Sequence, residues 1–255
     1  MARSRLLNTR SPVPLHRQLK SALASAIAAG RYRPGDRIPS ERLLCKVYGV
    51  SRTTVRQTVS ELVQDGHLIR VPAKGTFVAP PKIEQDLARV SRFSETVAAA
   101  GHLPTIRVLA AREITPSADV ARALELGAGE RAFRIDVLGC ANSDPLVLYR
   151  VHLRASWGAP IAADLRRAQA AGTASFGMIL ERVKADHGLV AAWAVQSYEA
   201  GVADAETAAV LGIGPGAPVF LSTRTIHTAD GVPIEHDEVV YRGDKYRFTI
   251  RRVYG

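Results

Sequence analysis

The stretch SERLLCKVYGVSRTTVRQTVSELVQDGHLI, residues 40–69, holds two short segments with apolar residues at helical spacing. Ser40 and Ser51 stand just before the two segments, where serine caps a helix, and Gly49 stands where the first helix would end. The sequence therefore predicts two helices joined by a sharp turn. The side chains predicted to face inward are Leu43, Leu44 and Val47 in the first helix and Val55, Val59, Leu62 and Val63 in the second.

The segments on either side of this stretch complete a small domain. Residues 14–30 have apolar residues at helical spacing, with proline at the start and glycine at the end. Residues 67–71 and 75–79 have the pattern of two short strands around the turn Pro72-Ala73-Lys74. Three helices followed by a β-hairpin describe a winged helix-turn-helix, in which the third helix enters the major groove of DNA.

The start of the third helix carries side chains that suit contact with DNA. Arg52, Thr53, Arg56 and Gln57 lie on its predicted outer face. Arginine can donate a pair of hydrogen bonds to guanine, glutamine can pair with adenine, and threonine reaches phosphate or a thymine methyl group. A good bidentate pair contributes roughly 1–3 kcal/mol of discrimination between bases. The alternative is that the two arginines form an ordinary solvated helix face.

The positive charge of the chain is concentrated in this region. Residues 1–80 contain 14 Lys and Arg against 4 Asp and Glu, whereas residues 81–255 contain 20 of each. A strongly basic domain tied to a neutral one indicates that the basic domain meets a polyanion. The alternative is a basic face that serves solubility alone.

The rest of the sequence predicts a second domain of mixed strands and helices. Residues 1–12 are expected to be a flexible basic arm, 13–79 the winged domain, 80–87 a linker and 88–255 the second domain. Strands are predicted at 104–114, 131–140, 145–153, 190–202, 217–228, 233–243 and 246–253, and helices at 116–126, 175–187 and 204–212. Residues 117–133 resemble residues 204–220, and each copy predicts a helix, a glycine turn and a β-hairpin. Two such units sharing one antiparallel sheet give an α+β domain.

Composition and spacing limit the classes of protein to consider. No run of about 18 apolar residues is present and the N-terminus lacks the apolar core of an export signal, so a cytoplasmic protein without a membrane span is expected. Cys45 and Cys140 are expected to be buried thiols rather than a disulfide or a metal pair. His227 and His236 flank a predicted hairpin, but the histidines show no metal-ligand spacing, and no nucleophile motif appears. The sequence therefore predicts neither a cofactor nor an enzyme.

Residues 14–78, from PLHRQLKSALASAIAAG to AKGTFV, resemble without gaps the DNA-binding domain of the GntR family of bacterial transcription regulators. The resemblance implies that the second and third helices and the wing contact an operator. With the outer-face glutamine included, the predicted DNA-binding residues are Arg42, Ser51, Arg52, Thr53, Thr54, Arg56, Gln57, Lys74, Gly75 and Thr76. The family usually has a glycine two residues before the wing glycine, where this chain has Ala73 after Pro72, so a stiffer wing is expected.

Residues 88–255 are similar to the effector-binding (UTRA) domain of the HutC branch of that family, on RFSETVAAAGHLP at 92–104, on PIEHDEVVYRGDKYRF at 233–248 and on the hairpin spacing. The resemblance implies a chorismate-lyase-like α+β fold with a pocket for a small polar ligand. It implies that Phe93, Ser94 and Ser175 lie at helix N-termini, where N–H groups receive an anion, and that Glu235 and Tyr241 form the opposite wall.

Three of these pocket residues have structural alternatives. Phe93 is also suited to the core, Ser175 to capping its helix, and Glu235 to pairing with Arg224 or Arg242.

The chain departs from relatives that sense amino-sugar phosphates. Those relatives carry two arginines and a glutamate in the pocket, and Val137, Gly139 and Tyr149 align with these positions. Because each charge-assisted bond to a phosphate contributes about 1.5–3 kcal/mol, the loss of two arginines argues against a sugar phosphate. A less charged effector is expected.

Together these patterns predict a ligand-responsive transcription regulator, and more specifically a repressor. It is expected to act as a homodimer on a palindromic operator in double-stranded DNA, and to release the DNA when a small-molecule effector binds. An enzyme of chorismate-lyase-like fold is the alternative that turnover of a ligand would favour. A protein that coats DNA without sequence preference is a further alternative, but it leaves the neutral second domain unexplained.

Overall fold

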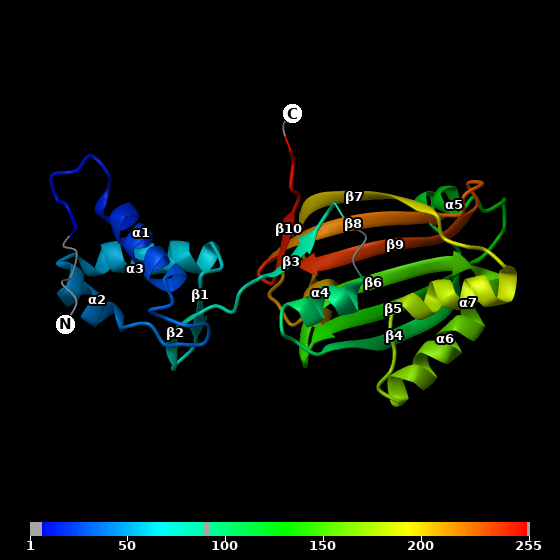
Figure 1. The fold of residues 1–255 in the computed structure, drawn as a ribbon, viewed down its shortest axis with the longest axis horizontal. Helices are drawn as coiled ribbons and strands as arrows, with labels where there is room; N and C mark the ends of the chain where they lie inside the picture. The colour runs from blue at the N-terminus through cyan, green and yellow to red at the C-terminus, as the bar shows by residue number, and fades with distance from the viewer. Residues whose placement is uncertain (1–6, 89–91, 254–255) are drawn as a thin grey trace. The chain divides into compact units, whose positions relative to one another are not determined.

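The computed structural model describes residues 7–88 and 92–253, and it divides into two compact units, Met1–Pro81 and Lys82–Gly255 (Figure 1). The division falls inside the segment predicted as a linker. Each unit has its own core, and each is described by itself below.

The first unit is the predicted winged helix-turn-helix. Its elements are α1 (Leu15–Ala28), α2 (Glu41–Tyr48), α3 (Arg52–Gln64), β1 (Leu68–Val71) and β2 (Gly75–Val78). The side chains of Ser40 and Ser51 accept hydrogen bonds from the N–H groups of Leu43 and Thr54, so they cap α2 and α3 as predicted. Gly49 ends α2 in the left-handed conformation, with φ of 67°. The core contains Leu19, Leu23, Leu44, Val55, Val59 and Leu62.

The inward face predicted for α2 is wrong at two of its three positions. Leu44 is 1% exposed, but Leu43 and Val47 are 47% and 42% exposed. Cys45 and Tyr48 pack against the core instead. The buried stripe is therefore rotated by one residue, a shift of about a quarter-turn that an eight-residue segment cannot fix by its pattern alone.

The second unit is built on a six-stranded antiparallel sheet with the strand order β4-β5-β6-β9-β8-β7. Its strands are β4 (Pro104–Ile114), β5 (Ala132–Ala141), β6 (Asp144–Arg154), β7 (Trp193–Val202), β8 (Pro218–His227) and β9 (Pro233–Arg242), and its helices are α4 (Phe93–Ala99), α5 (Ala118–Ala123), α6 (Ala155–Ala170), α7 (Gly177–His187) and α8 (Ala205–Leu211). The predicted repeat is present, because α5 leads into the β5–β6 hairpin as α8 leads into β8–β9. The two halves join where β6 pairs with β9.

Helices cover the two faces of this sheet unequally. On the face that we call the inner face, α4, α6 and α7 pack against Ile135, Tyr149 and Val151 (Figure 1). On the outer face, α8 packs against Leu138 and Leu148, and α5 packs near the start of β5. The inner face of β7 and β8 has no such helix of the described residues over it, and this leaves room for a cavity.

Three predictions about the second unit need correction. The linker prediction misses β3 (Ile83–Asp86), which pairs in parallel with β10 (Tyr246–Thr249) outside the six-stranded sheet. The strand predicted at 246–253 is correspondingly shorter. The helix α6 was not predicted at all. Ile83 and Tyr246 are buried, so apolar packing fixes the β3–β10 pair to the core.

Candidate functional site

The outer face of α3 presents a row of polar side chains. Arg52, Thr53, Arg56 and Gln57 are exposed, whereas the opposite face of the helix is buried in the core of the first unit. Arg42 on α2 is exposed as well. These five predicted DNA-binding residues are therefore accessible to a partner.

Three of the predicted DNA-binding residues also make bonds within the unit. Ser51 Oγ accepts a hydrogen bond from Thr54 N at 3.1 Å and lies 2.9 Å from Thr54 Oγ1. Gln57 Nε2 donates to Glu61 Oε1 at 3.1 Å, and Glu61 also pairs with Lys20. Ser51 and Thr54 thus shape the start of the helix, and the bond to Glu61 leaves Gln57 its second amide N–H and its carbonyl oxygen for a base.

The wing between β1 and β2 contains strained backbone. Ala73 has φ of 60°, where glycine is usual, and this left-handed conformation costs an alanine about 1–2 kcal/mol. Gly75 has φ of 126°, and a Cβ added there would lie 2.7 Å from Arg37 Nε. Arg37, which the sequence pattern did not single out, therefore packs against the base of the wing. Lys74 is exposed at the tip and Thr76 is half-buried in β2.

Most basic side chains of the first unit lack an acidic partner. Within residues 7–81, the Lys and Arg side chains with a carboxylate within 4.0 Å are Lys20, which pairs with Glu61 and Asp65, and Arg70, which pairs with Glu41. The arginines of α3 and the lysine of the wing therefore keep their charge for a polyanion.

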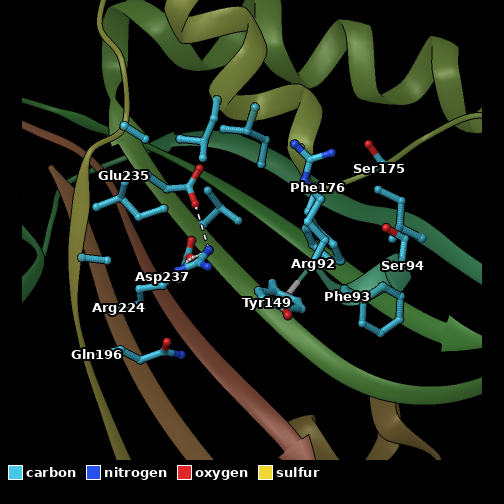
Figure 2. A pocket seen from close by; sticks show the side chains of 18 of the residues that line it. Arg92, Phe93, Ser94, Tyr149, Ser175, Phe176, Gln196, Arg224, Glu235 and Asp237 are labelled. Atoms are coloured by element: carbon cyan, nitrogen blue, oxygen red, sulfur yellow. Dashed lines mark hydrogen bonds and ion pairs between the residues drawn. The ribbon is translucent and has the colours of Figure 1, made fainter. Parts of the chain in front are cut away.

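The second unit contains a cavity of about 930 Å³ on the inner face of its sheet (Figure 2). Side chains from β6, β7, β8 and β9 form its floor, and the segments that lead into α4 and α7 form its wall. This volume lies within the range of roughly 300–1,000 Å³ that is typical of sites for small organic ligands.

Aromatic rings occupy the middle of the cavity. The ring centroids of Tyr149 and Phe176 are 4.1 Å apart, and Phe93 meets Phe176 edge-on at 5.6 Å. Tyr241 lies 6.3 Å from Tyr149 on the neighbouring strand. In Figure 2, Tyr149 and Phe176 lie between two polar ends of the cavity.

One end of the cavity is an ion-paired cluster on β8 and β9. Arg224 Nε donates to Asp237 Oδ2 at 2.9 Å, and Arg224 Nη2 lies 3.3 Å from Glu235 Oε1. Glu235 and Asp237 are 3% and 0% exposed. Burial raises the pKa of Glu235 well above the ordinary carboxyl value, and the charge of Asp237 raises it further, while Arg224 lowers it only in part. Glu235 therefore keeps its proton to a higher pH than an ordinary carboxyl group does.

In the part of the chain that the structure describes, the opposite end of the cavity carries the guanidinium of Arg92, the carboxylate of Glu181 and two hydroxyl groups. The guanidinium of Arg92 lies near the start of α7, since a Cβ added to Gly177 would be 3.8 Å from Arg92 Cζ. Ser94 and Ser175 line the same end. The helix α7 has Phe176 at its N-cap position with no side-chain hydrogen bond, so Ser175 does not cap it. This end is suited to an anionic or polar group.

The structure brings most of the predicted effector residues to this cavity. Those that line it are Phe93, Ser94, Tyr149, Ser175, Glu235 and Tyr241. Val137 and Gly139 do not line it, which corrects the prediction. Val137 is 0% exposed in the core, and a Cβ added to Gly139 would lie 2.8 Å from Phe93 Cζ. The ring of Phe93 thus covers Gly139, which aligns with a pocket arginine of the relatives that sense amino-sugar phosphates.

The sequence pattern missed several of the cavity's polar residues, including Arg92, Gln196, Arg224 and Asp237. Asp237 lies between two residues that were assigned to the wall, on the same side of β9, so the two-residue period of a strand was the signal for it. Arg224 stands opposite Asp237 in the β8–β9 register. Of the two pairings weighed for Glu235, the structure has the one with Arg224.

The histidines and cysteines form no shared site. His227 stacks on Trp193 with ring centroids 4.0 Å apart, and it stands opposite Pro233 rather than His236. Cys140 is a buried free thiol, and Cys45 is a half-buried one. Residues 7–88 and 92–253 contain no group of three or more His, Cys, Asp or Glu that could hold a metal ion. None of the helices described here combines the length and the apolar character needed to cross a membrane.

Comparison with known proteins assigns both units. Residues 15–78 match "Bacterial regulatory proteins, gntR family", and residues 99–247 match "UTRA domain". The chain is 32% identical over 243 residues to the HTH-type transcriptional repressor NagR of Bacillus subtilis, covering 95% of this chain and 96% of that protein. It is 28% identical to the histidine utilization repressor of Klebsiella aerogenes, with 94% and 95% covered. The crystal structure of PhnF from Mycobacterium smegmatis is similar, with a TM-score of 0.61 at 26% identity, covering 95% of this chain and 100% of that one.

Proposed function

This chain belongs to the gntR family of bacterial regulatory proteins and carries a UTRA domain, and we propose that it represses transcription from a palindromic operator until a small effector releases it. As a member of this family it is a DNA-binding transcription regulator and not an enzyme. The operator, the dimer contact and the effector are the parts that we propose.

The operator contact centres on the exposed face of α3. Arg52 and Arg56 lie one turn apart, and no carboxylate within the described part of the chain pairs with them, so both are available for bidentate bonds to guanine. Thr53 lies beside them and suits a phosphate or a thymine methyl group. Arg42 and Lys74 add positive charge on either side for the DNA backbone. This exposed, unpaired basic face is the observation that carries the proposal.

A second copy of the chain supplies the second half-site. We propose that the copies meet along β7, an edge strand of the sheet whose side chains are exposed or half-buried along its whole length. Val195 and Val202 are 63% and 69% exposed there, and Glu199 is its one charged residue. The other edge strand, β4, carries three charged residues, which discourage strand pairing. Antiparallel pairing of β7 with its copy creates the two-fold axis that a palindromic operator requires.

The dimer contact has a direct test. Val195→Lys should shift the protein from dimer to monomer in analytical ultracentrifugation and should weaken binding to a two-half-site operator. Leu109→Lys on β4 is the control, because Leu109 is 42% exposed on the opposite edge. A Val195→Lys dimer as stable as the wild type would place the contact elsewhere.

The effector is proposed not to be a sugar phosphate. Val137 and Gly139 align with the two arginines that bind phosphate in the relatives that sense amino-sugar phosphates. In this chain both positions lie in packed core. At the cavity's charged end, Arg224 is already paired with Asp237 and Glu235, so it offers no free positive charge to a dianion. Arg92 is the one positive side chain at the opposite end among the residues that the structure describes.

Effector binding acts on DNA affinity through a two-state equilibrium. The effector must contact the cavity more favourably in the state whose α3 helices no longer match the operator, and the coupling is typically about 1–3 kcal/mol.

The test of this function is selection of bound sequences from a random DNA pool at about physiological salt, where non-specific binding is weaker than at low salt. A palindrome should be enriched by the wild type, and its enrichment should be lost in Arg56→Ala. Arg122→Ala, which removes an exposed arginine of the second unit, should leave the enriched sequence unchanged. Failure to enrich any sequence would overturn the proposal.

A further inference from the structure

The cavity of the second unit is acidic although the chain as a whole is basic. Among residues 7–88 and 92–253, the charged residues that line it are the two arginines Arg92 and Arg224 and the four acidic residues Asp86, Glu181, Glu235 and Asp237. Even with Glu235 protonated, three carboxylates among these residues face two guanidinium groups, in a part of the chain, residues 81–255, that has 20 basic and 20 acidic residues. An arrangement of this kind favours ligands that carry positive charge.

The carboxylates of the ion-paired cluster are also incompletely satisfied. Glu235 Oε2 and Asp237 Oδ1 are buried and make no hydrogen bond among the described residues. Arg224 is the single cation beside the two carboxylates, and it contacts one oxygen of each. A protonated Glu235 can donate to Asp237, but once Glu235 is ionised both free oxygens need donors, and a ligand can supply them.

Within residues 7–88 and 92–253, Arg224 is the cation beside Glu235 on that side of the cavity. The titratable and charged groups that face this cluster are Arg224 of β8, Asp237 and Tyr241 of β9, Tyr149 of β6 and Tyr198 of β7. The tyrosines are held neutral, because burial raises the pKa of Tyr149, Tyr198 and Tyr241. Glu181 and Arg92 belong to the segments at the α4 and α7 wall.

From this geometry, and resting on the ligand-responsive role proposed above, we propose that the effector carries a cationic nitrogen group that binds at Glu235 and Asp237 and displaces a proton from Glu235. In the balanced step, the Glu235 carboxylic acid gives its proton to solvent as the ammonium or amidinium group of the effector arrives. The resulting carboxylate pairs with that cation, and the cluster then holds two positive groups for two carboxylates. The neighbouring rings of Tyr149 and Phe176 suit the apolar body of such a ligand and can face its cation.

The proton displacement follows from the energetics of burial. Burial disfavours the charged form of Glu235, and the charge of Asp237 adds to this, so Glu235 keeps its proton to a higher pH than an ordinary carboxyl group although Arg224 is beside it. Cation binding must therefore strengthen as pH rises toward the raised pKa, by up to about tenfold per pH unit.

The test uses ligands that share one carbon skeleton and differ in one end group. The probes are ε-aminocaproate, ε-hydroxycaproate and adipate, with the corresponding sets built on valerate and butyrate. Binding is followed by the fluorescence of Trp193, which lines the cavity. Isothermal titration calorimetry in two buffers of different ionisation enthalpy gives the number of protons released. We expect the amines to bind at least roughly tenfold more tightly than the hydroxy acids and diacids, with release of up to about one proton.

Variants then assign the effect to the cluster. Glu235→Gln keeps the shape of the side chain and should remove the proton release, while weakening amine binding roughly ten- to hundredfold. Asp237→Asn should weaken amine binding in the same direction. Glu113→Gln is the matched control, because Glu113 is an exposed glutamate paired with Arg131 outside the cavity.

Three binding results would overturn this inference: diacids that bind as tightly as amines, amine binding without proton release, or no amine binding at all. An infrared carboxylic-acid band at about neutral pH that is absent from Glu235→Gln supports the inference without any ligand.

The proposed function would be contradicted by different results from those that contradict the inference. Amines that bind and release a proton but do not alter operator affinity would contradict the regulatory role alone. Operator release by a metabolite that has no cationic group would leave that role standing and contradict the inference.

Discussion

Replacing Arg224 by methionine tests how much of the second unit's stability depends on the ion-paired cluster in its cavity. Methionine keeps much of the length and apolar volume of the arginine stem. It removes the hydrogen bonds that Arg224 makes to Asp237, one of them 2.9 Å long, and the 3.3 Å pairing with Glu235. Asp237 is 0% exposed and would keep a charge without a partner. Breaking a buried ion pair from one side costs about 3–5 kcal/mol, and the 28% exposure of the arginine side chain favours the lower end.

The loss must also depend on pH. In the variant, Asp237 or Glu235 can take up a proton, and the neutral carboxyl group then needs no countercharge. The free energy of this protonation becomes more favourable by about 1.4 kcal/mol for each unit by which the pH is lowered. Arg224→Met should therefore lose about 3 kcal/mol near pH 7 and clearly less near pH 5.

The assay is urea denaturation followed by tryptophan fluorescence. Both tryptophans of the chain, Trp157 and Trp193, belong to the second unit, so the signal reports on that unit alone. Arg122→Met is the control, because the 2.9 Å pair between Arg122 and Asp119 is highly exposed and should contribute at most about 1 kcal/mol. A loss in Arg224→Met no larger than in this control, or one that does not change with pH, would refute the reasoning.

Three further predictions concern the wing, the reading helix and Glu235. Gly75→Ala should destabilise the wing by about 1–3 kcal/mol, because φ of 126° disfavours alanine, and hydrogen exchange of the β1–β2 amides measures it against an unchanged α1. Arg52→Ala should weaken operator binding by roughly 1–3 kcal/mol and relax base preference at one position per half-site, and an unchanged preference in a mismatch series would mean that Arg52 reads no base. Because the pKa of Glu235 is raised in the folded protein, the contribution of Glu235 to the free energy of unfolding is fully present at acid pH, below the ordinary carboxyl pKa. That contribution is lost as the pH rises through the raised pKa. The free energy of unfolding should therefore fall with pH by up to about 1.4 kcal/mol per unit in the wild type, and Glu235→Gln should lack that slope in urea titrations at a series of pH values.

The first unit was predictable from sequence because its determinants are local. Ser40, Gly49 and Ser51 cap or end helices within a few residues of themselves, and the buried face of α3 follows a helical period over three turns. The error at Leu43 and Val47 arose in the shortest helix of that unit, where two turns leave the apolar face undetermined.

The missed helix α6 shows a different limit. Gly158 and Pro160 interrupt its helical pattern and are poor helix formers. Gly158 is required by a contact, because a Cβ there would lie 2.0 Å from Phe133 Cγ on β5. A glycine selected by close packing looks in the sequence like a glycine that ends a helix. Only the fold shows which one it is.

The candidate site was predictable only where its determinants are local. The family resemblance predicts Glu235 and Tyr241, and the two-residue period of a strand predicts that Asp237 faces the same side as they do. The position of Arg224 beside Asp237 depends on the register of β8 and β9. The position of Arg92 in the cavity depends on how closely the starts of α4 and α7 approach each other. The parallel pairing of β3 with β10 joins segments 163 residues apart, and no local pattern reports it.

The join between the two halves of the sheet has a consequence for how the unit unfolds. The hairpins β5–β6 and β8–β9 are local, whereas β6 and β9 meet across 84 residues of chain, with Tyr149 and Asp237 on either side of the join. Contacts of such long range are costly to close and are expected to open before the hairpins separate. A ligand that touches both strands would act as a clamp across this line. Effector binding would then be read out as slowed exchange of the amides between β6 and β9, and the two halves would unfold as one cooperative body.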